Sequence, residues 1–298
     1  MDYGDITNTL NRGGWTGAHS LTDAARLIHT ALGRDTLTQR SLRIWSSGDY
    51  DRIAAGFRDE ARTFVDRLSL RAGQRVLDAA CGSGNLTIPA ARTGAFVTGV
   101  DLVPGLLYAA SQWAARERLA LTLDLGNVER LPYADAQFDV VLSMFGIMFA
   151  ARPDEVVAEL ARVTRPGGRV ALANWTRRGF IGRLLAMHAA AVPAPAEVPS
   201  PLLWSDETVL RERFDERTWQ LTMTKRSLTF RYPHTPAGTA ELFRAAYGPT
   251  VRAFAALDED GRAAFAADLA EHWSWHQRGR GVSTEVEAEY LEVIAVRR

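Results

Sequence analysis

The chain has 298 residues, and its 35 Lys and Arg balance 35 Asp and Glu, so the formal net charge is zero. Acidic and basic residues are spread along the whole sequence, whereas a protein that binds many phosphates needs a concentrated positive face; this argues against nucleic acid or an anionic membrane as the main partner. The single Cys81 cannot form an internal disulfide, and no stretch reaches the roughly 18 uncharged apolar residues of a membrane span. These features predict a cytoplasmic protein whose main partner is not a polyanion, and they leave its small-molecule ligands and its oligomeric state open.

The first 70 residues are predicted to form a helical segment. Residues 1–20 show no periodicity and read as a mobile lead-in, and helical spacing begins at 21–32, which Gly33 ends. A second helix is expected over 51–68. Its apolar residues recur on one face, namely Ile53, Phe57, Ala61, Phe64 and Leu68.

Strands and helices then alternate from residue 71 to 176. Strands are expected over 75–79, 95–101, 121–125, 138–143 and 169–174, and helices over 85–92, 104–118 and 153–163, with a turn at 166–168. This rhythm indicates right-handed βαβ units and a parallel sheet covered by helices on both faces. The predicted fold class is therefore α/β, with a doubly wound sheet.

The rhythm loosens after residue 176. A helix over 180–191 precedes a Pro-rich stretch at 193–201, alternating residues at 219–230 predict a strand, two or three helices follow within 234–280, and a strand over 290–296 ends the chain. A helical block between two strands fits an insertion over one sheet edge better than an independent domain. We expect seven strands in one domain, 71–298, with helical segments at about 177–215 and 234–282.

The strongest local signal is Val-Leu-Asp-Ala-Ala-Cys-Gly-Ser-Gly-Asn at residues 76–85, a strand that enters a Gly-rich turn and then a helix. Glycines let the backbone approach a ligand, and the helix N-terminus offers unpaired N–H groups. The turn is not a dinucleotide fingerprint, because Thr87 occupies the third glycine position, and it is not a P-loop, because no Gly-Lys-Ser/Thr follows.

Two acidic residues restrict the kinds of ligand that the turn can bind. Asp78 directly precedes the turn, where a carboxylate would repel a pyrophosphate but could accept a hydrogen bond from an ammonium group or from N–H groups of the turn. Asp101 ends the second strand, where an acid binds ribose hydroxyls. A ligand that carries a ribose and a cation but no phosphate is S-adenosylmethionine.

These motifs resemble those of the class I S-adenosylmethionine-dependent methyltransferases over about residues 45–176. After the Gly-rich turn and Val100-Asp101-Leu102, the family order continues with Gly-Asn-Val-Glu-Arg-Leu-Pro-Tyr at 126–133, Phe-Asp-Val-Val at 138–141 and Arg-Val-Thr-Arg-Pro-Gly-Gly at 162–168. The subgroup most resembled is the one around the ubiquinone and menaquinone C-methyltransferases, with many small-molecule methyltransferases of secondary metabolism.

The resemblance implies a set of cofactor contacts. Gly82 and Gly84 would line the methionine part, Asp101 would hold the ribose and Leu102 would pack on the adenine. Asn127 stands where the family usually has Asp, and its side-chain oxygen can still accept a hydrogen bond. The segment 1–70 would cover the cofactor. The remaining candidate contacts are Tyr50, Asp78, Ala80 (in place of a common glycine), Asn85, Val128 and Ser143.

The same resemblance argues against several kinds of methyltransferase. Metal-dependent O-methyltransferases have an acid at the end of the fourth strand, where this chain has Ser143-Met144-Phe145-Gly146, so no metal site is expected. DNA methyltransferases that act on amino groups carry a Pro-Pro pair there, and the cytosine-C5 enzymes need a nucleophilic Cys nearby. Neither feature is present, which leaves small molecules as the expected acceptors.

Catalytic residues are harder to assign, because methyl transfer needs only an in-line approach, a dry site and in some cases a base. His272 and His276 share a face of a predicted helix, and Tyr247 lies in the same helical segment, so these three are the candidates; packing is the alternative role for each. Aromatic and thioether side chains are expected to form a flat apolar acceptor pocket. The predicted pocket residues are Met144, Phe145, Met148, Trp175, Phe180 and Trp204.

The expected activity is metal-independent methyl transfer to a small, partly apolar acceptor, with S-adenosylhomocysteine as the product. Three alternatives stay open. The protein could use the cofactor structurally, as a methyltransferase-like cyclase or decarboxylase; it could be a nicotinamide-dependent oxidoreductase on the same topology; or it could be a ligand sensor without catalysis.

Overall fold

A seven-stranded mixed sheet forms the centre of the part of the chain that the computed structural model describes, residues 35–279 and 282–298. The strand order is β3-β2-β1-β4-β5-β7-β6. Strands β1 to β5 are parallel to one another, and β7 is antiparallel to both β5 and β6. The predicted doubly wound α/β fold is confirmed. The strands are β1 (Arg75–Ala79), β2 (Phe96–Asp101), β3 (Thr122–Leu125), β4 (Phe138–Met144), β5 (Thr164–Trp175), β6 (Trp219–Tyr232) and β7 (Thr284–Arg297).

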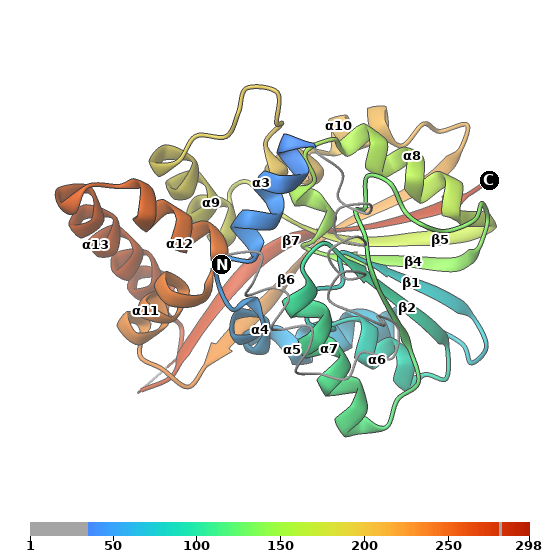
Figure 1. The fold of residues 1–298 in the computed structure, drawn as a ribbon, viewed down its shortest axis with the longest axis horizontal. Helices are drawn as coiled ribbons and strands as arrows, with labels where there is room; N and C mark the ends of the chain where they lie inside the picture. Colours follow the sequence, from blue (N-terminus) through green and yellow to red (C-terminus); the bar gives the residue numbers. More distant parts are fainter. Residues whose placement is uncertain (1–34, 280–281) are drawn as a thin grey trace, which may run out of the picture.

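Helices cover both faces of this sheet (Figure 1). On one face lie α5 (Arg58–Arg67), α6 (Thr87–Arg92) and α7 (Pro104–Glu117), and on the other lie α8 (Pro153–Val163) and α10 (Glu207–Arg213). Because both faces are covered, the central strands are almost continuously buried. The remaining described helices are α3 (Thr36–Trp45), α4 (Tyr50–Ala54), η1 (Ala55–Phe57), η2 (Ile147–Phe149), α9 (Phe180–Ala191), η3 (Pro201–Ser205), α11 (Pro236–Ala246), α12 (Gly248–Ala256) and α13 (Glu259–His276).

The last two strands, β6 and β7, form an antiparallel pair that extends past the rest of the sheet (Figure 1). All of β6 pairs with β7, whereas β5 pairs only with residues 290–296 of β7. The projecting half carries Phe230 and Tyr232 to the block of α11, α12 and α13, where both rings contact Trp273. The predicted strand over 290–296 is therefore only the second half of β7, and the predicted late helical block is three helices inserted between β6 and β7.

The single helix predicted over 51–68 is wrong, because α4, η1 and α5 divide this segment. Tyr232 causes the break: a Cβ on Gly56 would lie 2.3 Å from its ring, and its hydroxyl donates a hydrogen bond of 2.7 Å to the Ile53 carbonyl. In a continuous helix that carbonyl would accept from the Phe57 N–H instead. The predicted apolar face is nonetheless buried, since all five of its residues belong to the core.

Two other segments differ from expectation. No helix is predicted over 36–45, yet α3 forms there, with Asp35 as its N-cap; its carboxylate accepts from the Thr38 N–H at 2.9 Å. The turn expected at 166–168 is a bulge inside β5, where Gly167 has a φ of 71° and the register with β4 shifts. The predictions for 1–20 and 21–32 lie outside the described residues.

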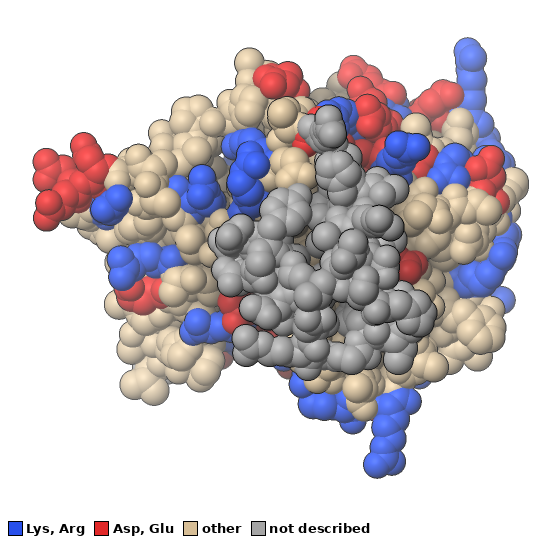
Figure 2. All heavy atoms as spheres, viewed as in Figure 1, with Lys and Arg blue, Asp and Glu red and all other residues tan. Residues whose placement is uncertain are grey.

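The surface carries charges of both signs. On the face seen in Figure 2, basic and acidic side chains are interspersed around the rim, and no large area of one sign is visible outside the grey atoms. None of the helices in the described ranges is long and apolar enough to cross a membrane.

Candidate functional site

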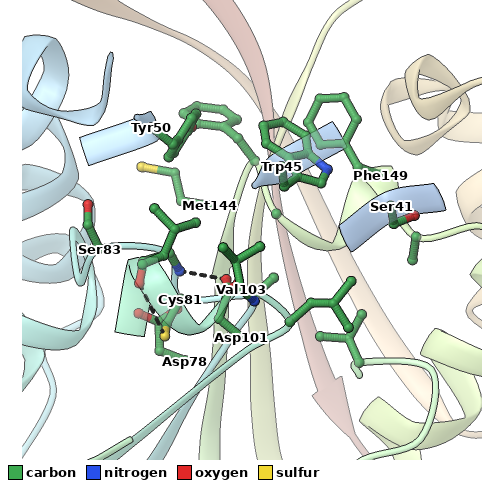
Figure 3. A pocket seen from close by; sticks show the side chains of 18 of the residues that line it. Ser41, Trp45, Tyr50, Asp78, Cys81, Ser83, Asp101, Val103, Met144 and Phe149 are labelled. Atoms are coloured by element: carbon green, nitrogen blue, oxygen red, sulfur yellow. Dashed lines mark hydrogen bonds between the residues drawn. The ribbon is translucent and has the colours of Figure 1, made fainter. Parts of the chain in front are cut away.

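A pocket lies at the carboxyl ends of β1, β2 and β4 (Figure 3). The strand order reverses at β1, because β2 and β3 are added on one side of this strand and β4 and β5 on the other. Open α/β sheets bind ligands at this kind of switch point. Two unlike walls face each other across the pocket. The strand-end wall consists of Asp78, Ala80, Cys81, Gly82, Ser83, Asn85, Asp101 and Leu102. The helical wall consists of Thr38, Ser41, Trp45, Tyr50 and Phe149.

The Gly-rich turn of the strand-end wall has an unusual backbone. Ala80, Gly82 and Gly84 all have left-handed φ angles, of 58°, 54° and 95°. This costs Ala80 about 1–2 kcal/mol, whereas glycine adopts it freely. A Cβ on Gly84 would lie 3.3 Å from Ala110, so this glycine lets α7 approach the turn and does not itself line the pocket.

Asp101 organises the turn as well as lining the pocket. Its carboxylate accepts hydrogen bonds from the Gly82 N–H at 2.8 Å and the Val103 N–H at 2.9 Å. Burial raises its pKa above the ordinary range, although both backbone donors act in the opposite direction. The two donors leave lone pairs on both oxygens, so the carboxylate can accept further hydrogen bonds from a ligand.

Asp78 lies next to Asp101 in the same wall. Its side chain is buried and accepts a hydrogen bond of 2.6 Å from the Thr87 hydroxyl. Burial raises the pKa of Asp78 to about 7, and the nearby charge of Asp101 adds to the shift. A cationic group in the pocket would oppose both effects and favour the ionised carboxylate.

Two polar atoms of the strand-end wall have no partner among the described residues. They are Ser83 Oγ and Asn85 Oδ1, and both are buried. The Asn85 amide nitrogen is used, since it donates to the Ala54 carbonyl at 3.0 Å. Buried polar atoms without partners are costly, so these two fit a ligand with its own polar groups, such as the amino-acid end of the cofactor.

Aromatic rings dominate the helical wall (Figure 3). Trp45 contacts Tyr50 and Phe149 edge to face, with ring centroids 5.6 and 4.9 Å apart. Tyr247 lies behind this layer, 5.9 Å from the Trp45 ring and 6.4 Å from the Tyr50 ring, and does not line the pocket. Burial raises the pKa of Tyr50 far above its usual value, so its hydroxyl stays protonated.

Met144 and Phe145 line the pocket at the end of β4. Phe145 has a φ of 61°, which is rare for an aromatic residue and marks a sharp, strained turn of the kind found at functional sites. Its ring stacks on Trp175, with 3.5 Å between the centroids. Trp175 thus supports the pocket from behind and is not part of its surface.

Most predicted cofactor contacts come together here. The residues that line the pocket are Tyr50, Asp78, Ala80, Gly82, Asn85, Asp101, Leu102, Asn127 and Val128. Ser143 does not line it, because its hydroxyl is buried and donates to the Ala79 carbonyl at 2.7 Å. Of the predicted acceptor residues, the structure places Met148, Phe180 and Trp204 in the core, away from the pocket lining.

The two candidate histidines belong to the packing of α13 on α9. His272 stacks on Phe180 at 4.3 Å, and its Nε2 lies 3.0 Å from the Phe180 carbonyl; His276 Nδ1 lies 2.8 Å from the His272 carbonyl. Burial and the neighbouring His276 lower the pKa of His272 to about 4. Neither residue lines the pocket, so the structure favours the packing role for both.

The resemblance implies that segment 1–70 covers the cofactor, and Phe149 is one of several aromatic residues near the strand ends, but the sequence patterns predict neither α3 nor η2. Thr38, Ser41 and Trp45 reach the pocket from α3, and Phe149 reaches it from η2. A local signal for α3 exists, because Asp35 is a favourable N-cap in front of Leu42 and Trp45 at helical spacing. Nothing local indicates that this helix packs over the strand ends.

The described residues contain no group of three or more His, Cys, Asp or Glu side chains that could hold a metal ion. Cys81 lines the pocket, but burial raises the pKa of its thiol well above the usual value. It is therefore not an activated nucleophile.

Known proteins resemble the chain in sequence and in fold. A family model described as a methyltransferase domain matches residues 77–172. The protein Rv1403c of Mycobacterium tuberculosis, described only as uncharacterised, is 38% identical over 217 residues, which cover 72% of this chain and 79% of that protein.

Two solved structures share the fold. The YcgJ protein from Bacillus subtilis has a TM-score of 0.56 at 16% identity, with 80% of this chain and 99% of that chain covered. The [4+2]-cyclase SpnF has a TM-score of 0.54 at 20% identity, with 80% of each chain covered. At these identities the likeness concerns the fold alone. The match at 77–172 and the shared fold support a class I S-adenosylmethionine-dependent methyltransferase. The long match to Rv1403c shows that the chain belongs to the family of that protein.

Proposed function

We propose that the protein transfers the methyl group of S-adenosylmethionine, without a metal ion, to a small, partly apolar acceptor with an aromatic or polyketide-like framework. S-Adenosylhomocysteine is then the second product. The observation that carries the proposal is the meeting of two unlike walls in one pocket: buried acids and a left-handed turn on the strand-end wall, and aromatic rings on the helical wall.

The strand-end wall suits the cofactor. Asp101 would accept hydrogen bonds from the ribose hydroxyls, and Asp78 would face the amino-acid end, where its carboxylate favours a positive charge. Ser83 Oγ and Asn85 Oδ1, which have no partner among the described residues, would form hydrogen bonds with polar groups of the cofactor. When bound, the cofactor supplies an electrophilic methyl group on a sulfonium centre.

The charges of the pocket argue against a nicotinamide dinucleotide. Among the described residues, no Lys, Arg or His lines it, and its buried acids lie beside the turn that would have to hold a pyrophosphate. Thr87 stands at the third glycine position of the dinucleotide fingerprint, and its hydroxyl binds Asp78. A phosphate-free cofactor fits this arrangement better.

The helical wall supports a flat acceptor. Trp45, Tyr50 and Phe149 offer ring faces and edges, and Met144 adds a polarisable thioether (Figure 3). None of these four is a general base at neutral pH, since Tyr50 stays protonated. The acceptor would therefore be a nucleophile that needs little help in losing a proton. We assign the protein to the group of small-molecule methyltransferases around the ubiquinone and menaquinone C-methyltransferases, and we expect an acceptor of secondary metabolism.

Calorimetry tests the cofactor, and product formation tests the reaction. We expect S-adenosylhomocysteine to bind and NADH and NADPH not to bind; the reverse result would establish the oxidoreductase alternative. Purified protein is then incubated with S-adenosylmethionine and a panel of phenols, quinols and polyketides. Formation of S-adenosylhomocysteine with any of them supports the proposal. Tight cofactor binding without turnover of the panel would favour a structural use of the cofactor, as in a methyltransferase-like cyclase.

A further inference from the structure

A closed ring of hydrogen bonds lies at the N-terminal end of α3. Asn127 Nδ2 donates to Thr38 Oγ1 at 3.0 Å, and Thr38 Oγ1 donates to Asp35 Oδ2 at 2.7 Å. Arg152 binds Asp35 through two nitrogens, at 2.6 and 3.0 Å, and binds Glu129 at 2.7 Å. The Glu129 N–H donates to Asn127 Oδ1 at 2.9 Å, which completes the ring.

The direction of each hydrogen bond in this ring is fixed. The Glu129 N–H can only donate, so the amide oxygen of Asn127 faces it and the amide nitrogen faces Thr38. Arg152 holds the pKa of Asp35 well below its usual range, so this carboxylate only accepts. The Thr38 hydroxyl must therefore donate to Asp35, and it presents a lone pair to Asn127.

Position 127 consequently requires a donor. An aspartate there would direct a carboxylate oxygen at the lone pair of Thr38, and it would add a second acid beside Glu129, which is already buried. Asparagine donates on one side and accepts on the other with the same shape. This requirement accounts for the departure of Asn127 from the aspartate that is usual in the family.

The apolar contacts of α3 lie in its second half, where Trp45 contacts three aromatic rings. Only Thr38 and Leu42 of this helix are buried, and Leu42 and Val103 form a small cluster apart from the main core. At the other end of the helix, Gly248 of α12 lies against the Ile44 carbonyl, where a Cβ would be 2.2 Å from the oxygen. The N-terminal end of α3 is held mainly by the polar ring.

We propose that this ring is a latch that holds α3 over the cofactor pocket, and that Asn127 is a positioning residue that acts through Thr38. The latch matters to function because Thr38, Ser41 and Trp45 of α3 form much of the helical wall. The inference goes beyond the proposed function and depends on it only where cofactor affinity is the measurement.

A double-mutant cycle between positions 35 and 127 tests the latch. Asn127→Asp places two acceptors face to face, and Asp35→Asn removes the charge that Arg152 binds. Asp35 Oδ2 also accepts from the Thr38 N–H and from Arg152, so an asparagine at 35 cannot close the ring in the opposite direction. Each change alone opens the same ring, and the second change should therefore add little to the first. We measure hydrogen exchange of the α3 amides in ligand-free protein and the affinity and dissociation rate of S-adenosylhomocysteine.

We expect Asn127→Asp to speed exchange of the α3 amides and to weaken S-adenosylhomocysteine binding about 10- to 100-fold. Asp35→Asn should act in the same direction, and the double variant should lose little more than the weaker-binding single variant, because both changes open one ring. Gln220→Glu, an exposed site on β6 that gains the same charge, should change neither quantity.

Two results would overturn the latch: unchanged α3 exchange in Asn127→Asp, or additive losses in the double variant. If Asn127→Asp does not fold, Thr38→Val decides in the same way, because it removes the central hydroxyl with little change of shape. If the wild type binds no S-adenosylhomocysteine, the proposed function fails, while amide exchange in the ligand-free variants still decides the latch.

Discussion

The two walls of the pocket are built in opposite ways. The strand-end wall comes from one short stretch, 78–102, in which a turn and two strand ends bring Asp78 and Asp101 together. The helical wall collects Ser41, Tyr50 and Phe149 from three separate helices. The backbone of the sheet therefore fixes the cofactor side, whereas side chains on added helices shape the acceptor side and can change without altering the sheet.

Loss of Asp101 should break the strand-end wall. Asp101→Ala removes the acceptor for the Gly82 and Val103 N–H groups as well as the ribose contact, and hydrogen bonds to charged groups contribute about 1.5–3 kcal/mol each. We expect S-adenosylhomocysteine affinity to fall at least about 100-fold by calorimetry. Asp66→Ala, on the exposed face of α5, is the control; equal binding by Asp101→Ala and this control would refute the assignment of the ribose site.

A neutral residue at position 78 tests whether a pH-dependent acid distinguishes the strand-end wall from the helical wall. The folded protein raises the pKa of Asp78 from 3.8 to about 7, so the folded state binds more protons than the unfolded state between these values. The unfolding free energy of the ligand-free protein therefore receives a contribution that falls as the pH rises through this window, by about 2–4 kcal/mol in all.

Asp78→Asn should remove this slope. Urea titrations at pH 5 and pH 8 should show the ligand-free variant gaining stability over the wild type at the higher pH. S-Adenosylhomocysteine affinity of the wild type should rise between pH 6 and 8, because binding needs the carboxylate, and this rise should be absent in the variant. A wild-type affinity that is flat with pH would count against Asp78 as the partner of the ammonium group.

Truncation of the helical wall at η2, which leaves α3 in place, should affect the acceptor alone. Phe149→Ala removes a ring that packs on Trp45, and we expect the KM for the acceptor to rise about tenfold. The affinity for S-adenosylhomocysteine should stay within about twofold. Phe96→Ala, whose ring is 69% exposed on β2, serves as the control. Equal losses for cofactor and acceptor would show that the two walls do not have separate tasks.

The smallest expected effect concerns the break that positions Tyr50 at the start of α4. Tyr232→Phe removes the hydroxyl that binds the Ile53 carbonyl, which should lower the unfolding free energy by about 1 kcal/mol in urea titrations. Tyr108→Phe, in α7, is the matched control. An unchanged stability would mean that the break depends on the fit of the ring against Gly56 and not on the hydroxyl.

Sequence patterns predict the sheet well because they are local. The strands and helices between 75 and 163 lie within one or two residues of expectation, and the order of the motifs is enough to bring Asp78, Gly82 and Asp101 to one edge. The patterns fail where a distant residue intervenes. Periodicity over 51–68 predicts one helix, and only the arrival of Tyr232 beside Gly56 divides it.

Local sequence patterns are enough to predict the α/β class, the Gly-rich turn and the acids of the strand-end wall, because parallel strands end at one edge whatever surrounds them. Apart from Tyr50, the helical wall depends on tertiary packing. This packing brought Thr38 to Asn127, sent His272 to Phe180 and put Trp175 behind Phe145, through contacts between segments that are 30 to 92 residues apart. Such contacts depend on how separate elements pack, and no local periodicity records them.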